Sequence, residues 1–164
     1  MKFPRKLLLT LIVMVAAFAA VACTGETPED VSAGAGASTS ADGKINLNNM
    51  TDDQLTETIP DFGGSMVFEF FEYQPYVSIA EFRREIGKYV DDDQVAEYET
   101  YIFVPIEINE SDAATLAQIP GVDEALAETL ISGRPYSSNE AFLTVLGESL
   151  ASDEVDVAAT YLRQ

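Results

Sequence analysis

The chain of 164 residues has no histidine, no tryptophan and a single cysteine, Cys23. No disulfide can form within it. Neither a histidine-based catalytic triad nor a His/Cys metal site can be built from its residues. A catalytic site would have to consist of carboxylates alone, and no pair of carboxylates stands out as a general acid and base. We therefore expect a protein that is not an enzyme and that carries neither a metal nor another cofactor.

Basic residues are also scarce, since nine Lys and Arg stand against 28 Asp and Glu, for a formal net charge of −19. Three of the nine, Lys2, Arg5 and Lys6, precede Cys23, whereas every acidic residue follows it. Such a charge repels nucleic acid and anionic membranes at long range. Yet 47% of the residues are apolar, which is too many for a disordered acidic tail. The composition predicts a folded core under an acidic surface.

The first 23 residues have the pattern of an export signal. A positive start is followed by an apolar run of 16 residues, Leu7 to Ala22, shorter than the roughly 20 that a membrane-spanning helix needs. The run ends in Ala20-Val21-Ala22-Cys23, which resembles the lipobox of bacterial lipoproteins. That resemblance implies cleavage before Cys23, a lipid on its thiol and a protein anchored on the extracytoplasmic side of a membrane, in the periplasm or at the cell surface. The alternatives are an uncut signal anchor and an ordinary signal peptide with a chance cysteine.

Residues 24–43 are small and polar, with no apolar period, and predict a flexible linker. The chain after this linker consists of two similar copies of one sequence pattern. One copy begins at Ile45-Asn46-Leu47-Asn48 and the other at Ile106-Glu107-Ile108-Asn109, 61 residues later. From Ile59-Pro60 and Ile119-Pro120 onward the offset is 60. We predict a tandem duplication, with one unit over 44–103 and the other over 104–164.

Each unit has the sequence signals of four short helices, which makes the predicted fold all-α. Thr51 with Gln54 forms a capping box, and Ser78 with Glu81 and Ser137 with Glu140 predict two more. Ser111 and Ser152 are further candidate caps. Prolines fall in the breaks, and residues 103–108 predict an extended connector. The expected helices lie near 52–59, 65–73, 79–87, 92–102, 112–118, 124–132, 139–146 and 153–162.

The segment 119–131, IPGVDEALAETLI, resembles the helix-hairpin-helix motif. The longer frame, over about 45–102 and again 106–162, resembles ComEA-type competence proteins and PsbU, an extrinsic subunit of photosystem II. The start at 44–49 and the break at 75–78 look closest to the PsbU type. This resemblance implies a fold of tandem helix-hairpin-helix units, but a fold does not fix a ligand.

Nucleic-acid-binding members of this family use two hairpin glycines and the helix N-terminus behind them to hold a phosphate. Here Asp123 replaces one glycine beside Gly121, and Asp61 replaces the other beside Gly63. We predict that Asp123 caps its helix, so that the chain's own carboxylate takes the bonds of a phosphate and the hairpin serves packing. The candidate hairpin residues are Pro60, Asp61, Gly63, Gly64, Pro120, Gly121 and Asp123.

Two groups of residues are candidates for a partner surface. Arg83, Arg84 and Lys88 form the main basic cluster, and they either contact a phosphate or an acidic partner or pair with Glu81 and Glu85 on their own helix. The helix near 65–73 is apolar over most of its circumference, so it either packs on both sides or docks another protein. Its candidate residues for a partner surface are Phe68, Phe70 and Phe71.

Asp91, Asp92 and Asp93 lack the spacing of a calcium loop and predict a helix N-terminus instead. Taken together, these features favour a non-catalytic, membrane-anchored extracytoplasmic protein that binds a partner protein, as an accessory subunit of a membrane or envelope complex. The alternatives are a ComEA-like DNA receptor for DNA uptake and a spacer with no specific ligand. Phosphate binding depends on Lys and Arg contacts, which disfavours the DNA receptor.

Overall fold

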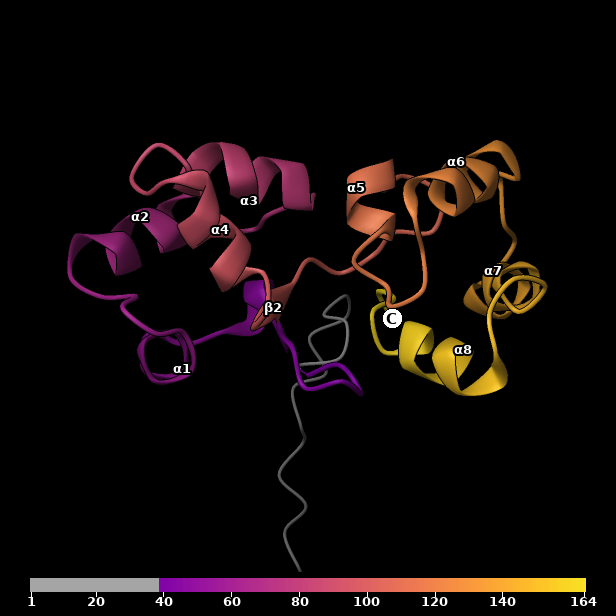
Figure 1. The fold of residues 1–164 in the computed structure, drawn as a ribbon, viewed down its shortest axis with the longest axis horizontal. Helices are drawn as coiled ribbons and strands as arrows, with labels where there is room; N and C mark the ends of the chain where they lie inside the picture. Colours follow the sequence, from indigo (N-terminus) through magenta and orange to yellow (C-terminus); the bar gives the residue numbers. More distant parts are fainter. Residues whose placement is uncertain (1–38) are drawn as a thin grey trace, which may run out of the picture. The chain divides into compact units, whose positions relative to one another are not determined.

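The computed structural model describes residues 39–164, so Cys23, the predicted export signal and most of the predicted linker lie outside it. Within that range the chain is mostly helical, with eight α-helices and a two-stranded sheet (Figure 1). This confirms the all-α fold class. None of the helices between residues 39 and 164 has the length and apolarity to span a membrane.

The helices follow the predicted order closely. Strand β1 (Ile45–Asn46) leads into a short 3-10 helix, and strand β2 (Ile102–Phe103) separates the fourth helix from the fifth. The helices are α1 (Asp52–Thr58), α2 (Ser65–Glu72), α3 (Ile79–Ile86), α4 (Asp92–Tyr98), α5 (Ala113–Leu116), α6 (Glu124–Ser132), α7 (Asn139–Leu146) and α8 (Ser152–Ala159).

The largest difference from the sequence prediction lies after α4, which was expected to run to 102 and ends at Tyr98. Ile102 and Phe103 instead pair in parallel with Ile45 and Asn46. Backbone groups that would have continued the helix are satisfied in this ladder. Likewise α8 ends at Ala159, because Ile106 and Leu162 form a bridge.

Most of the helix starts are capped as the sequence predicts. Thr51 and Gln54 form the capping box of α1, Ser78 accepts the amide of Glu81, and Asp91 caps α4. Three predicted caps are wrong by one residue. The residues before α5, α7 and α8 are Asp112, Ser138 and Ala151, in place of Ser111, Ser137 and Ser152.

Two hydrophobic clusters lie in the described chain, one mostly within residues 44–103, called here the first half, and one mostly within 104–164, the second half. The connector after α4 contributes to both. Ile102 and Val104 belong to the first cluster, whereas Phe103 between them belongs to the second. Successive side chains of an extended segment point to opposite sides, so the connector serves both cores.

The same local hydrogen bonds occur in both halves. The Asn48 side chain donates to the Tyr76 carbonyl and accepts from the Tyr76 amide, both at 2.8 Å. Asn109 makes the same pair of bonds to Tyr136, at 2.9 and 2.8 Å. Both tyrosine hydroxyls donate to a carbonyl six residues earlier. Each loop before α3 and α7 is thereby fixed by one buried tyrosine and one asparagine.

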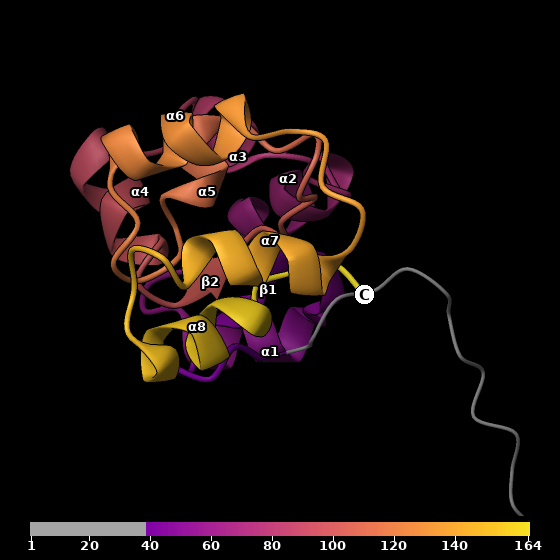
Figure 2. The ribbon, with the colours of Figure 1, turned by 90° about the vertical axis from the view of Figure 1, so that its right-hand side faces the viewer.

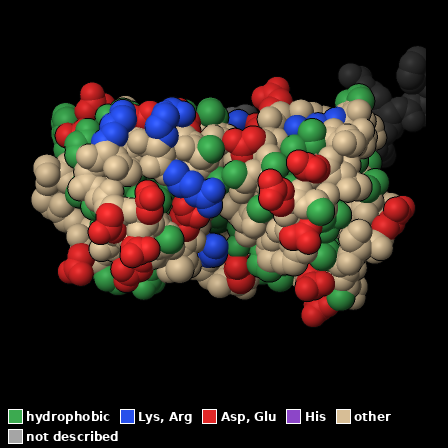
Figure 3. Space-filling view, turned by 45° about the horizontal axis from the view of Figure 1, so that its top comes forward, with side chains coloured by type: hydrophobic (Ala, Val, Ile, Leu, Met, Phe, Trp, Pro, Cys, Tyr) green, Lys and Arg blue, Asp and Glu red, His purple; other side chains and the backbone are tan. Residues whose placement is uncertain are grey.

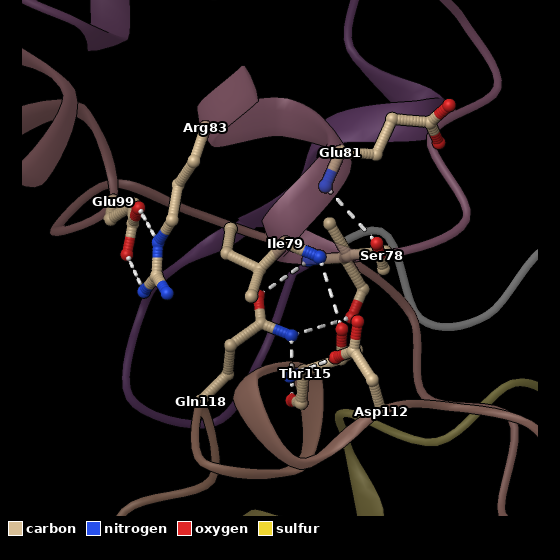
Figure 4. Close-up of polar contacts among 9 residues, drawn as sticks. Ser78, Ile79, Glu81, Arg83, Glu99, Asp112, Thr115 and Gln118 are labelled. Carbon is tan, nitrogen blue, oxygen red and sulfur yellow. Dashed lines mark hydrogen bonds and ion pairs between the residues drawn. The ribbon is translucent and has the colours of Figure 1, made fainter. Parts of the chain in front are cut away.

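Helix α5 joins the two halves. The amide of Ile79, the first residue of α3, donates to the Thr115 hydroxyl of α5 at 3.0 Å. Within the second half, the Gln118 side chain, two residues after α5, holds the connector by accepting from the Val104 amide at 2.8 Å and donating to the Val104 carbonyl at 3.2 Å. Figure 4 shows Thr115 and Gln118 facing the start of α3. We call this contact between the two halves the seam. It is polar, because the backbone amide of Ile79 in the first half finds its acceptor in the second half.

Candidate functional site: the two hairpin turns

The second hairpin, between α5 and α6, lies next to side chains from α8 and the turn before it. Gly121 has a φ of +85°, a conformation that favours glycine. A Cβ at this position would lie 2.9 Å from Leu150 Cδ2 and 3.3 Å from Glu154 Oε1. Figure 2 places α8 in the second half with α6 and α7. Gly121 is itself exposed, but an apolar and an acidic side chain lie beside its backbone.

Asp123 caps α6, as the sequence predicts. Its backbone is extended and its carboxylate accepts the amide of Leu126 at 2.8 Å. Glu124 follows in the first turn of the helix. A phosphate held by this hairpin would meet the same amides and the same positive end of the helix dipole. The position is occupied by the chain's own carboxylate, with that of Glu154 beside the turn.

The first hairpin, between α1 and α2, differs from the second. Gly64 precedes α2 with a φ of +63° and supplies no side-chain cap. A Cβ on Gly63 or Gly64 would have no atom within 4 Å. No side chain therefore caps this helix N-terminus, whereas Asp123 caps that of the second hairpin. Asp61 lies in its turn with a φ of +57°, at the position that glycine holds in the second hairpin.

The prolines of the hairpins, Pro60 and Pro120, are exposed and precede Asp61 and Gly121. Pro60 lies two residues after the end of α1 and Pro120 four residues after the end of α5, where proline disfavours further helix. The turn that contains each proline is closed by a buried isoleucine, Ile59 or Ile119, whose carbonyl accepts an amide three residues later. Both hairpins therefore keep the tight turn, whatever occupies their helix N-termini.

Two residues of the basic cluster pair within their own helix. Arg84 and Lys88 both bind the Glu85 carboxylate, and Arg84 lies 3.5 Å from Glu81. The hydrogen bonds from Lys88 and Arg84 lower the pKa of Glu85 below its usual value. The prediction of local pairing holds for these two cations, which leaves little of their charge for a phosphate.

Arg83 does not follow that prediction, because it pairs with Glu99, the C-cap of α4. Its Nε and Nη2 donate to the two carboxylate oxygens at 2.6 and 2.7 Å. This bidentate hydrogen bond raises the pKa of Arg83 and links α3 to the end of α4. Figure 4 shows the pair beside the seam. On the face drawn in Figure 3, blue side chains gather mainly over the left and central parts, and red ones are spread widely.

The aromatic candidates divide between surface and core. Phe70 is fully buried and contributes to the first cluster, so its assignment to a partner surface is wrong. Phe71 is half-buried with its ring 5.2 Å from that of Phe70. Phe68 is 70% exposed. Of the three, Phe68 is the one with a broad surface for a partner.

One hollow in the structure was not predicted from the sequence. It has a volume of about 480 Å³ and is lined by loops of both halves, including Val77, Pro105 and Glu110. No local motif marks it, because its walls come from segments far apart in the sequence. Within residues 39–164 no group of Asp, Glu, Cys or His is arranged to hold a metal ion, and Asp91 is engaged as the cap of α4.

Comparisons with known proteins identify no relative. The chain matches no family model, no curated protein and no solved structure. The helix-hairpin-helix resemblance therefore rests on the residues themselves.

Proposed function

We propose that this chain is a non-catalytic protein, anchored by lipid on Cys23 to the extracytoplasmic side of a membrane, whose two tandem helix-hairpin-helix units bind a partner protein. It would act as an accessory subunit of a membrane or envelope complex. Support for the tandem units comes from the paired bonds of Asn48 to Tyr76 and of Asn109 to Tyr136. They recur at the offsets of the sequence repeat.

The single observation that carries the proposal is the filled second hairpin. Asp123 accepts the helix amide that would hold a phosphate, and Glu154 and Leu150 lie beside Gly121. A nucleic-acid phosphate at this turn would displace these side chains and face two carboxylates at short range. This geometry favours a hairpin that packs two helices together. The acidic surface around it is then available to bind a protein.

Phe68 is the best candidate contact for that protein. It stands on α2 with 70% of its surface exposed, next to the half-buried Phe71. Burying a phenylalanine side chain contributes about 1.5–3 kcal/mol, and aromatic residues are enriched at the centres of interfaces. An interface centred on Phe68 would bury this ring without unpairing any buried ion pair.

Site-specific photo-crosslinking in the producing organism tests the proposal. A photoreactive phenylalanine analogue replaces Phe68 in the full chain, and the control places it at Glu57 on the exposed face of α1. We expect one discrete adduct from position 68 that protease removes and nuclease does not. The partner identified from it, once purified, must bind the full chain, and Phe68→Ser must weaken that binding. An adduct that nuclease removes would contradict the proposal.

The anchor has a separate test. Cys23→Ser should abolish incorporation of labelled palmitate and move the protein from the membrane fraction to the soluble one. Labelled lipid on the Cys23→Ser chain would rule out a lipid on that thiol.

A DNA receptor is the second candidate, and one observation favours it. The N-terminus of α2 has no side-chain cap and its glycines are open, as a phosphate site requires. Asp61 in the same turn and the scarcity of Lys and Arg oppose it. We rank it second because one open hairpin out of two gives few phosphate contacts.

A further inference from the structure

The hollow between the two halves has an apolar side and an acidic side. Its volume is about 480 Å³. Pro75, Val77 and Pro105 supply apolar lining, and Glu107, Glu110 and Asp112 supply carboxylates. Val77 is 71% exposed, so its side chain is accessible to a ligand in the hollow.

Both walls are held in place by hydrogen bonds. On the first-half side Asn48 binds the Tyr76 backbone, and the Val77 amide donates to Glu81 Oε2 at 2.9 Å. On the second-half side the Glu107 amide donates to the Ser111 hydroxyl at 2.9 Å, and Arg134 donates to the carbonyls of Ile108 and Ser111. A hollow with fixed walls binds without paying a large ordering cost.

The acidic side carries excess negative charge. Glu107 pairs with Arg163, which also lines the hollow. Asp112 uses Oδ1 to cap α5 through the Thr115 amide at 2.8 Å, which leaves its charge in place. No ion pair within residues 39–164 involves the Glu110 carboxylate. Three carboxylates and one guanidinium therefore line the same hollow.

We propose that this hollow receives an arginine or lysine side chain from a basic segment of the partner protein. The aliphatic stem would lie along Pro75 and Val77, which are both exposed, and the charged end would reach Glu110 and Asp112. Basic side chains bury their stems on apolar surface in this way, and a guanidinium suits carboxylates especially well. This inference rests on the proposed function and specifies the chemistry of the partner.

A labelled peptide tests the inference. The probe is acetyl-Gly-Ser-Arg-Ser-Gly-amide, titrated into the full chain in a nonionic detergent at physiological salt, which screens the general acidic field. The same peptide with citrulline in place of arginine keeps the shape and removes the charge. We expect binding of the arginine peptide and binding of the citrulline peptide weaker by tenfold or more.

The double variant Glu110→Gln with Asp112→Asn should weaken binding of the arginine peptide about tenfold. Asparagine caps helices as well as aspartate does, so α5 should persist. The matched control, Asp53→Asn with Glu57→Gln on α1, makes the same change in net charge away from the hollow and should alter binding less than twofold. Methyl signals of Val77 should shift on binding in labelled protein.

Equal losses in the two double variants, or an arginine peptide that does not bind, would overturn the inference. Its failure can be told from failure of the proposed function. If position 68 still yields a protein adduct while the peptide does not bind, the partner docks elsewhere on the chain. If the adduct is nucleic acid, the proposed function itself is wrong.

Discussion

The residues Asp61 and Gly121 hold equivalent places in the two hairpins, both with positive φ, and substitutions there should have opposite signs. Gly121→Ala places a methyl group in the left-handed region, which costs about 1–2 kcal/mol. The new Cβ would also lie 2.9 Å from Leu150 Cδ2, the end of a half-buried side chain that can shift at small cost. The expected destabilisation is therefore about 1–2 kcal/mol.

Asp61→Gly should instead stabilise the protein by about 0.5–1 kcal/mol. Glycine removes the strain of a side chain at a φ of +57°, and it also removes one negative charge from a strongly acidic chain. The gain is smaller than the loss at Gly121 because glycine adds freedom to the unfolded chain.

The assay is thermal unfolding of the full chain followed by far-ultraviolet circular dichroism. For a domain of this size we expect Gly121→Ala to lower the Tm by about 4–8 °C and Asp61→Gly to raise it by about 2–4 °C. Glu57→Gln, on the exposed face of α1, removes one negative charge as Asp61→Gly does and serves as the control. An unchanged Tm for Gly121→Ala would refute the strain expected from the positive φ of Gly121. If Asp61→Gly destabilises the protein, the aspartate has a role that these contacts do not describe.

Three further perturbations follow from single contacts. Asp123→Ala should lower the free energy of unfolding by about 1 kcal/mol in urea denaturation, while Asp123→Asn should leave it nearly unchanged; equal losses would show that the charge matters more than the cap. Thr115→Val should cost about 1–3 kcal/mol, because the Ile79 amide loses its acceptor across the seam, and an unchanged stability would mean that the seam opens without cost. Partial burial would raise the pKa of Asp42, but hydrogen bonds from Ser40 and Tyr161 outweigh it and lower the pKa below 3.8. Its contribution is therefore complete well above pH 3.8 and is lost as the pH falls through the depressed value. Asp42→Asn should cost about 1 kcal/mol at neutral pH, and the difference from the parent should vanish in acid; a difference that persists at the lowest pH would refute this.

The sequence predicts the helices well because their starts are local. The position of Asp123 before an apolar helix predicts that it caps that helix, and its carboxylate accepts the Leu126 amide of α6. Where two candidate caps stand side by side, as Ser137 and Ser138 do, sequence alone does not choose between them. The choice falls to the residue whose backbone is extended next to the first helical turn.

Features that depend on distant residues were not predictable. The end of α4 is set by pairing of Ile102 with Ile45, and the partner of Arg83 lies sixteen residues away at Glu99. The phase of α2 decides that Phe70 is buried and Phe68 exposed, although the helix is apolar nearly all round. The hollow beside Val77 needs both halves in place. These are products of tertiary packing, which local pattern does not encode.

The pair of changes Asp123→Gly and Glu124→Lys gives the reverse experiment at the second hairpin. It removes the internal cap and replaces one carboxylate with a cation near the helix N-terminus. We expect the variant to bind duplex DNA at low salt better than the parent. A variant that binds no better would contradict the idea that Asp123 and Glu124 are what keeps phosphate from this hairpin.

We propose that the partner is a protein and not a nucleic acid, and titration of duplex DNA with the parent full chain tests this most directly. The measurement is electrophoretic mobility at low salt, where phosphate contacts are strongest. We expect no shift of the DNA up to tens of micromolar protein. Binding at micromolar concentration or tighter would contradict it and assign the open N-terminus of α2 to phosphate.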